Sequence, residues 1–362
     1  MFKKSMALLL VMMLLVGLMA GCGQKAPEQP APAAPTEEEK TDITVGFVTD
    51  IGGIDDRSFN QGTYEGIKEY AGEKGWKEGQ EYKYIQSNEE ADYIPNLSAF
   101  GDEAYNLVIA AGFLFENAMK EVAPQYADTN FAIIDAVIDA PNVASVVFAE
   151  EQGSFLVGVA AAKATKTKKV GFVGGMDFPL IRKFHAGFVA GVHSVDKSIQ
   201  VVDQYAGDFG NPGAGQQIAS TMYAQGVDVI YHAAGGTGNG VINEAKNRVE
   251  NGKEVWVIGV DKDQYEDGKL ASGKSVVLTS MMKRVDVAAY SMIEAQEKGE
   301  FPGGKTTALT LKEDGVGIPA ENPNLAADIV TEINSYKDKI VAGEIVVPTT
   351  MDELKAFEAN LK

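Results

Sequence analysis

The sequence predicts an α/β fold with two doubly wound domains, each a mostly parallel sheet covered by helices. From Ile43 onward, short β-branched or aliphatic runs alternate with amphipathic stretches, which is the pattern of strands joined by covering helices. This alternation occurs as two successive series. The chain has 362 residues, a length that suits about two domains. Two βα series in one chain therefore imply two such domains.

The individual strands follow from these runs. The first series predicts strands at residues 43–50, 81–86, 106–112, 131–137 and 142–149. The second series predicts strands at residues 168–175, 199–205, 227–234 and 254–261. The stretches between them, such as FNQGTYEGIKEYAGEKG and PLIRKFHAGFVAGVHSV, are helix-like.

The tail adds too few elements for a third domain, so we expect it to complete the first two. It predicts a strand at 275–280, a helix at 283–298, a strand at 306–314 and a helix at 326–341. We expect one lobe from residues 43–148 with 279–312, and the other from 149–278 with 313–362. The chain then crosses between the lobes several times, which gives a hinge with a cleft.

The first residues are typical of an export signal. Lys3 and Lys4 precede an uncharged apolar run, Met6–Ala20, whose 15 residues are fewer than the roughly 20 that a membrane-spanning helix needs. The run ends in LMAGC, which resembles the lipobox of bacterial lipoproteins, with Met19 where leucine is commoner. The resemblance implies that residues 1–21 are a signal peptide and that Cys22 carries lipid. The alternative is a free buried cysteine after an ordinary signal.

Residues 22–42 predict an extended tether, because this stretch has four prolines, four glutamates and no large apolar side chain. The folded body would then be held at the extracytoplasmic face of the cell membrane.

Composition and motifs exclude several functions. With 32 Lys plus Arg against 51 Asp plus Glu, the formal net charge of −19 opposes binding of nucleic acid polymers. Cys22 is the only cysteine, so the chain has no intrachain disulfide and no cysteine-based metal site. The three histidines, His185, His193 and His232, match no metal spacing and are expected to be surface or packed residues.

The sequence motifs that resemble enzyme sites lack the context or spacing that those sites need. Residues 299–306 match the phosphate-loop pattern G-x-x-x-x-G-K-T, but a predicted helix precedes them and a predicted strand follows, the reverse of a functional loop. The glycine-rich run 235–240 lacks dinucleotide-binding spacing, and no serine lies in a nucleophile elbow. We therefore expect no catalysis, no cofactor and no metal.

The predicted strand ends carry polar and aromatic groups, and ligands of open α/β sheets bind outside those ends. The loop after the first strand reads DIGGIDDRSFNQ, in which Asp56 or Ser58 can cap the following helix. Phe59 and Asn60 would then face the cleft, unless Phe59 packs as core. Asp135 and Asp261 end later strands; a helix-capping role is the alternative for Asp135.

Several motifs in order resemble the BMP family of basic membrane lipoproteins. They are VTDIGGIDDRSFNQGTYEG, EEQGSFLVGVAAAKATKTKKVGFVGG, GTGNGVINEA, VIGVDKDQ and LTSMMKRVDVA. That family contains substrate-binding proteins of ABC transporters related to the purine nucleoside receptor. The resemblance implies a type I periplasmic-binding-protein fold, whose two lobes are joined by a multi-crossover hinge. It also implies a monomer that binds nucleosides and delivers them to ABC permease and ATPase subunits.

The resemblance assigns roles to eight residues. Phe59 and Phe209 would stack on a purine, with Tyr205 as the alternative to Phe209, since a purine has two π faces. Asn60 and Asp135 would bind the edge of the base, with Asp50 beside them. Asp261 would bind the ribose hydroxyls, with Lys283 and the Gly236 backbone near the sugar. For Lys283 the alternative is an exposed lysine at a helix start.

The sequence leaves two alternatives to nucleoside binding for transport. The same fold could bind a sugar or another small polar metabolite, because aromatic rings and carboxylates also suit sugars. The protein could also be an extracytoplasmic sensor or a surface adhesin.

Overall fold

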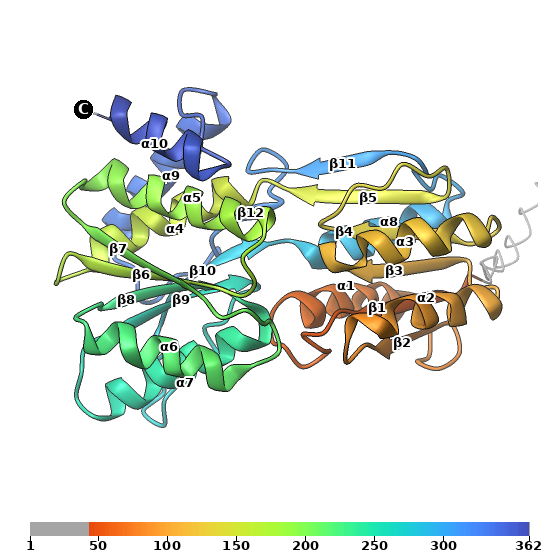
Figure 1. Ribbon diagram of the computed structural model, residues 1–362, viewed down its shortest axis with the longest axis horizontal. Helices are drawn as coiled ribbons and strands as arrows, with labels where there is room; N and C mark the ends of the chain where they lie inside the picture. Colours follow the sequence, from red (N-terminus) through yellow and green to blue (C-terminus); the bar gives the residue numbers. More distant parts are fainter. Residues whose placement is uncertain (1–42, 362) are drawn as a thin grey trace, which may run out of the picture. The chain divides into compact units, whose positions relative to one another are not determined.

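The computed structural model describes residues 43–361. The expected signal peptide, the lipid-bearing Cys22 and the tether lie outside the described residues. Within 43–361 the chain forms two six-stranded sheets, as expected for a doubly wound α/β protein (Figure 1).

The first sheet has the order β11-β5-β4-β3-β1-β2, and all its neighbouring strands are parallel. Its strands are β1 (Val45–Thr49), β2 (Tyr82–Gln86), β3 (Leu107–Ala111), β4 (Asn130–Ile134), β5 (Val143–Phe148) and β11 (Thr306–Leu309). Its helices are α1 (Phe59–Lys74), α2 (Tyr93–Asp102), α3 (Glu116–Val122) and α8 (Val285–Glu297), with 3-10 turns at Glu90–Asp92, Phe113–Phe115 and Ala123–Gln125. We call this unit the first lobe.

The second sheet repeats the arrangement with the order β12-β10-β9-β8-β6-β7, and only β12 is antiparallel to its neighbour. Its strands are β6 (Lys169–Gly174), β7 (Gln200–Tyr205), β8 (Val229–Ala233), β9 (Trp256–Asp261), β10 (Val277–Lys283) and β12 (Val316–Gly317). Its helices are α4 (Glu150–Ala164), α5 (Pro179–Val195), α6 (Pro212–Ala224), α7 (Gly235–Glu250), α9 (Ala327–Val341) and α10 (Met351–Asn360). We call this unit the second lobe.

Alternating side chains bury both faces of each sheet. On β3, Leu107 and Ile109 belong to the core that also contains Ile67 of α1, whereas Val108 and Ala110 belong to the core that contains Leu97 of α2. Since successive strand residues point to opposite faces, an all-apolar strand requires helices on both sides. The apolar runs that predicted the strands thus also predict the layered architecture.

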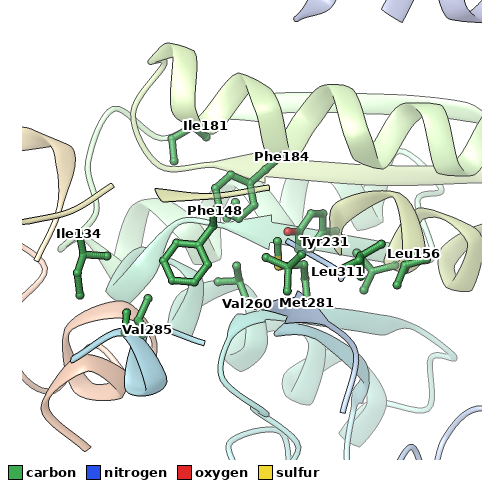
Figure 2. Close-up of a cluster of buried hydrophobic side chains, with 14 of the residues drawn as sticks. Ile134, Phe148, Leu156, Ile181, Phe184, Tyr231, Val260, Met281, Val285 and Leu311 are labelled. Atoms are coloured by element: carbon green, nitrogen blue, oxygen red, sulfur yellow. The ribbon is translucent and has the colours of Figure 1, made fainter. Parts of the chain in front are cut away.

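The first of these cores continues from one lobe into the other. Figure 2 shows Ile134 and Phe148 of the first lobe in the same buried cluster as Phe184, Val260 and Met281 of the second. The two lobes therefore share apolar packing beside the segments that connect them.

Three segments connect the lobes. The chain passes from β5 to α4 at residues 148–150, from β10 to α8 at 283–285, and from β11 to β12 at 309–316. We expected the second crossing at residue 279, but pairing with β9 as far as Met282 and with β12 as far as Lys283 keeps β10 in the second sheet. The crossing lies later because the strand continues into the apolar run MM before it ends.

The strand expected at 306–314 is also shorter than predicted. It ends at Leu309, where the chain turns so that the Gly315 amide donates to the Thr310 carbonyl at 2.8 Å. The order of α8 before β11 around the phosphate-loop-like residues 299–306 agrees with the sequence-based expectation.

Candidate functional site

A cavity lies between the lobes at the carboxyl ends of both sheets. Its free volume in this closed arrangement is about 50 Å³. Its walls come from both lobes: Asp50, Gly52, Asp56, Phe59, Asn60, Gly112, Phe113 and Asp135 from the first, and Leu180, Ile181, Phe184, Phe209, Ala233, Ala234, Gly235, Val260, Asp261 and Lys283 from the second. Seven of the eight predicted ligand-binding residues are thus brought together.

The exception is Gly236. Its neighbour Gly235, the first residue of α7, lines the cavity, and Gly236 follows it in the same turn. A Cβ atom at Gly236 would lie 3.1 Å from the Phe209 carbonyl oxygen, so this position holds α7 close to the Phe209 loop.

The loop after β1 forms a buried hydrogen-bonded cluster. Asn60 Nδ2 donates to Asp50 Oδ1 at 2.7 Å, and Asn60 Oδ1 accepts from the Asp50 amide at 3.1 Å. The Gly52 amide also donates to Asp50 Oδ1, at 2.8 Å. These bonds fix the Asp50 and Asn60 side chains at the cavity wall, because each locks the rotamer of the other.

Asp56 caps α1. Its Oδ1 accepts from the Ser58 and Gln61 amides at 2.9 and 3.0 Å, and its Oδ2 accepts from the Asn60 amide at 2.7 Å. A carboxylate that accepts several amides at a helix start satisfies donors that have no partner inside the helix. Of the two capping residues expected from the sequence, Asp56 performs the role, and the Ser58 hydroxyl instead donates to Asp261 Oδ2 of the second lobe.

Two aspartates occupy equivalent places in the two lobes with the same unusual backbone. Asp135 follows β4 with φ 73°, and Asp261 ends β9 with φ 67°. The left-handed region is uncommon outside glycine and is enriched for Asp and Asn, and such backbone often lies at binding sites. No helix begins at Asp135, so the helix-capping alternative for that residue is wrong.

Lys283 joins the lobes inside the cavity. The Lys283 side chain is 1% exposed, and its ammonium donates to Asp135 Oδ2 across the cleft. The alternative of an exposed helix-start lysine is therefore wrong. Because Lys283 occupies only one oxygen of Asp135, the buried Oδ1 has no hydrogen-bond partner among the described residues. Such an atom is costly to leave unpaired, so it favours a ligand that donates a hydrogen.

Aromatic rings line the cavity from both sides. Phe59 and Phe209 both lie in its wall, and the Phe209 ring packs so closely on Gly175 that a Cβ there would lie 2.2 Å from a ring carbon. Tyr205 is not in the wall; its hydroxyl lies 3.1 Å from His185 Nδ1 beneath the second sheet. The geometry therefore favours Phe209 over Tyr205 as the second ring. Phe59 also packs against the core, so the cleft-facing and the core-packing interpretations of this residue are both compatible with the structure.

Burial sets the electrostatics of the cavity. It raises the pKa of Asp50, Asp56, Asp135 and Asp261 from 3.8 to about 6 in each case, and the Lys283 ammonium opposes this rise at Asp135 and Asp261. Burial lowers the pKa of Lys283, but the carboxylates of Asp135, Glu150 and Asp261 outweigh it and hold that pKa above its usual value.

The histidines lie away from the cavity wall. His185 stacks on Phe172 with ring centroids 4.6 Å apart, His193 Nδ1 lies 2.6 Å from Glu358, and His232 is fully buried in β8. Within residues 43–361 no group of three or more His, Cys, Asp or Glu side chains is placed to hold a metal ion.

Two aromatic cavity residues were given no ligand-binding role from the sequence. Phe113 and Phe184 line the cavity from the ends of β3 and from α5, and Phe113 contacts the Phe209 ring edge-on at 6.1 Å across the cleft. Phe113 follows Gly112 at a predicted strand end, which was an available signal. Phe184 lies inside a helix, where nothing in the sequence separates a cavity-facing ring from a core ring.

Polar contacts also join the lobes at the cavity mouth, away from the crossings. Asn239 Nδ2 donates to the Asp56 carbonyl at 2.9 Å, and Gln264 Nε2 donates to the Arg57 carbonyl at 3.0 Å. Lys262 pairs with Glu65 at 2.6 Å. The structure therefore describes the closed arrangement of the two lobes.

Known proteins resemble this chain along most of its length. It is 44% identical to the "CD4+ T-cell-stimulating antigen" of Listeria innocua serovar 6a, over 96% of this chain and 99% of that protein. It is 39% identical to the "ABC transporter nucleoside-binding protein BmpA" of Lactococcus lactis subsp. cremoris, again over 96% and 99%.

Solved structures agree with the fold. An ABC transporter solute-binding protein from Aeropyrum pernix K1 superimposes with a TM-score of 0.77 at 30% identity, covering 87% of this chain and 98% of that one. This confirms the expected type I periplasmic-binding-protein fold. None of the helices between residues 43 and 361 has the length and apolarity needed to cross a bilayer.

The family follows from these matches. The family model Bmp, described as "ABC transporter substrate-binding protein PnrA-like", matches residues 43–351. The protein belongs to the Bmp family of ABC transporter substrate-binding proteins.

Proposed function

We propose that the protein captures nucleosides, with purine nucleosides preferred, by closing its two lobes, and delivers them to an ABC importer. In this proposal Cys22 anchors the chain by a lipid at the outer face of the cell membrane. The lipid anchor is supported by the sequence LMAGC, and the ligand class by the name of the Lactococcus lactis relative.

The unpaired Asp135 Oδ1, in a cavity that the Phe59 and Phe209 rings also line, is the observation that carries the proposal. A nucleobase supplies both things that this place lacks: a flat face for Phe59 and Phe209, and an N–H donor at its edge. Asp50 and Asn60 lie in the same wall and would complete the edge contacts. In the second lobe, the Asp261 carboxylate would accept ribose hydroxyls, with Lys283 beside the sugar.

The charge of the cavity supports a ligand without phosphate. Four buried aspartates line the cavity, and among the described residues of its wall Lys283 is the one cation. Bringing a phosphate into this closed, acidic space would place like charges together without water, which is strongly unfavourable. A nucleoside is uncharged and offers several hydrogen-bond donors, so it suits the cavity and a nucleotide does not.

Calorimetry tests the ligand. The purified protein, unfolded and refolded to remove any bound metabolite, is titrated with inosine, guanosine, adenosine, cytidine, ribose and inosine monophosphate. We expect the purine nucleosides to bind most tightly and the monophosphate not to bind. If ribose binds and the nucleosides do not, the ligand is a sugar and the base-stacking assignment is wrong.

Transport and absence of catalysis need separate measurements. Uptake of radiolabelled inosine at low concentration should fall in cells that lack the protein; unchanged uptake would favour a sensor. Chromatography after long incubation with each nucleoside should recover the nucleoside intact, and release of free base would show an enzyme.

A further inference from the structure

Two of the three segments that connect the lobes are joined by a buried ion pair. Glu150 is the first residue of α4, directly after the first crossing, and Lys283 is the last residue of β10, directly before the second. Glu150 Oε1 lies 3.5 Å from Lys283 Nζ, and both side chains are 1% exposed. Glu150 is not part of the cavity wall, whereas Lys283 is.

A second lysine holds Glu150 from the other side. Lys183 of α5 donates to Glu150 Oε2 at 2.6 Å and to the Phe148 carbonyl at 2.9 Å. The Phe148 carbonyl ends β5, so Lys183 fixes both the end of that strand and the carboxylate that follows it. Glu150 Oε2 is therefore hydrogen-bonded to Lys183, whereas Oε1 accepts no hydrogen bond from the described residues and interacts with the Lys283 ammonium by charge alone.

Aromatic rings surround the Lys283 ammonium, so its charge needs anionic partners. The ammonium lies 5.0 Å from the centre of the Phe59 ring, 5.1 Å from that of Phe148 and 5.5 Å from that of Phe184. Figure 2 shows Phe148 and Phe184 next to each other in the cluster that both lobes share. Apart from the carboxylates, this surrounding is apolar, so a buried ammonium depends on charged partners.

Four charged groups act on the Lys283 ammonium. They are Asp135 after β4, Asp261 at the end of β9, Glu150 on α4 and Lys183 on α5. Asp135 and Asp261 face the cavity and are available to a ligand. Glu150 is the one of the three carboxylates that does not line the cavity.

We propose that Glu150 is a positioning residue, which holds the Lys283 ammonium in the cavity wall from the hinge side. It does so through the chain of contacts Lys183–Glu150–Lys283–Asp135, which runs from α5 across the first crossing into the cleft. Held in this way, Lys283 occupies Asp135 Oδ2 and leaves Oδ1 for the ligand. The inference deepens the proposed function and rests on it wherever nucleoside affinity is the measurement.

The test compares Glu150→Gln with Glu151→Gln. Glu151 is the next residue, is also buried, and lies 3.5 Å from Lys183, but no contact links it to Lys283. Affinity is measured by calorimetry at several pH values, with inosine at neutral pH and with adenosine at alkaline pH, because adenosine lacks the acidic ring N–H that inosine loses there. We expect Glu150→Gln to weaken binding at least about fivefold at neutral pH, as loss of a buried charge partner does, and Glu151→Gln to stay within about twofold.

The alkaline side of the pH profile separates positioning from general damage. Loss of the Lys283 proton removes the cation that balances Asp135 and Asp261, so affinity falls at high pH. Without Glu150 the ammonium is less stabilised, and this fall should begin at lower pH in Glu150→Gln but not in Glu151→Gln. An unshifted profile in Glu150→Gln, or an equal shift in both variants, overturns the proposal.

A ligand-free measurement keeps the inference independent of the ligand assignment. The Lys283 signal is followed through a pH titration by NMR of protein labelled in its lysine side chains, and is assigned as the signal missing from Lys283→Arg. We expect the pKa of Lys283 to be lower in Glu150→Gln than in the wild type and unchanged in Glu151→Gln. If the wild type binds no nucleoside but this difference is present, only the proposed function fails.

A further variant guards against misfolding. Glu150→Asp keeps the negative charge and withdraws it by one methylene group, so its inosine affinity and its Lys283 pKa should lie between those of the wild type and Glu150→Gln. If both values equal those of the wild type, the proposed role of Glu150 is contradicted, because that role depends on the distance between its carboxylate and the Lys283 ammonium.

Discussion

At the residue scale, the cavity separates carboxylates that the fold uses from carboxylates that it leaves for a ligand. Asp56 accepts three backbone amides at the start of α1, so its oxygens are occupied. Asp135 has one oxygen on Lys283 and one without a partner. Buried acceptors without donors destabilise the empty closed form, and a ligand that donates hydrogen bonds removes this cost.

The pH dependence of binding follows from the raised pKa values of these groups. In the empty protein, Asp135 and Asp261 have pKa values of about 6, so both are mostly protonated at pH 5. A ligand that donates to carboxylates binds the ionised form, hence affinity should fall as pH drops through about 6. We expect inosine to bind at least about tenfold more weakly at pH 5 than at pH 7 in calorimetry.

The free energy of unfolding should change with pH in the opposite sense. A raised pKa means that the folded empty protein keeps protons that the unfolded chain releases between the ordinary value of 3.8 and about 6. Stability of the empty protein therefore falls as pH rises through this window, and then stays constant with respect to these groups. Asp261→Asn should make both dependences shallower; a flat affinity profile in the wild type would contradict the assignment.

Phe59 can be tested for its two roles at once. Phe59→Ala should weaken purine nucleoside binding by about 1 to 3 kcal/mol, through lost ring contact and buried area. Tyr205→Ala is the control, because the Tyr205 ring is partly buried against the same core but lies outside the cavity wall. It should lower the denaturation midpoint with little change in affinity. Normal binding in Phe59→Ala with reduced stability would assign Phe59 to the core alone.

The sequence could predict which residues end strands, but not how their side chains pair across the cleft. The local pattern places Asp135 and Asp261 at strand ends and Phe59 at a helix start. The resemblance to the Bmp family added Lys283 to the candidate residues. The contact of Lys283 with Asp135 joins residues 148 positions apart in different lobes, and depends on lobe closure. Local pattern carries no information about that distance, so the exposed-lysine alternative could not be excluded.

At the element scale, glycines allow pairs of helices to pack backbone against backbone. A Cβ at Gly66 of α1 would lie 2.1 Å from the Asp286 carbonyl oxygen of α8, and one at Gly187 of α5 would lie 2.2 Å from the Glu151 carbonyl oxygen of α4. Both α8 and α4 directly follow crossings between the lobes. The glycines therefore allow the first helix after each of these crossings to pack closely on a helix of the lobe that it enters.

Two substitutions in α1 test this packing. Gly66→Ala should lower the free energy of unfolding by about 1 to 3 kcal/mol, because the added methyl group overlaps α8. Gly72→Ala is the matched control: it lies in the same helix, nothing stands within 4 Å of its added Cβ, and it should raise stability by about 0.5 to 1 kcal/mol through helix propensity. Urea denaturation measures both, and equal effects would show that α1 and α8 do not pack through Gly66.

Element boundaries could be predicted where the pattern is local. Strands such as β3 and β9 begin and end within a few residues of their predicted bounds, because each is an apolar run with turn residues on both sides. The end of β10 and the crossing after it could not be predicted so well. The apolar character continues through MMK, and only pairing with β9 and β12 decides which sheet these residues join.

At the scale of the whole described chain, closure is held by contacts on the side of the cleft away from the crossings. Lys262 Nζ donates to both carboxylate oxygens of Glu65, at 2.6 and 2.8 Å. This pair is partly exposed, so its contribution is modest. It joins α1 of the first lobe to the segment after β9 of the second, and must break when the cleft opens.

Removing this pair should change how fast a ligand leaves. Lys262→Gln should release inosine about two- to fivefold faster, with little change in the association rate, because a partly exposed pair adds about 1 kcal/mol or less to the closed form. Lys269→Gln is the control, since Lys269 pairs with Glu266 inside the same lobe. Stopped-flow fluorescence measures both rates; equal release rates in wild type and Lys262→Gln would remove this contact from the closure mechanism.

The three crossings also fix the order in which the lobes are finished during synthesis. The ribosome makes β1 to β5 first, but the edge strand β11 and the covering helix α8 of the same lobe come from residues 285–309, after β6 to β10. A nascent chain that ends near residue 270 lacks the partner of β5 and the helix that packs on Gly66. The first lobe therefore stays incomplete until Leu309 has been added, and a fragment of residues 43–148 cannot reproduce it.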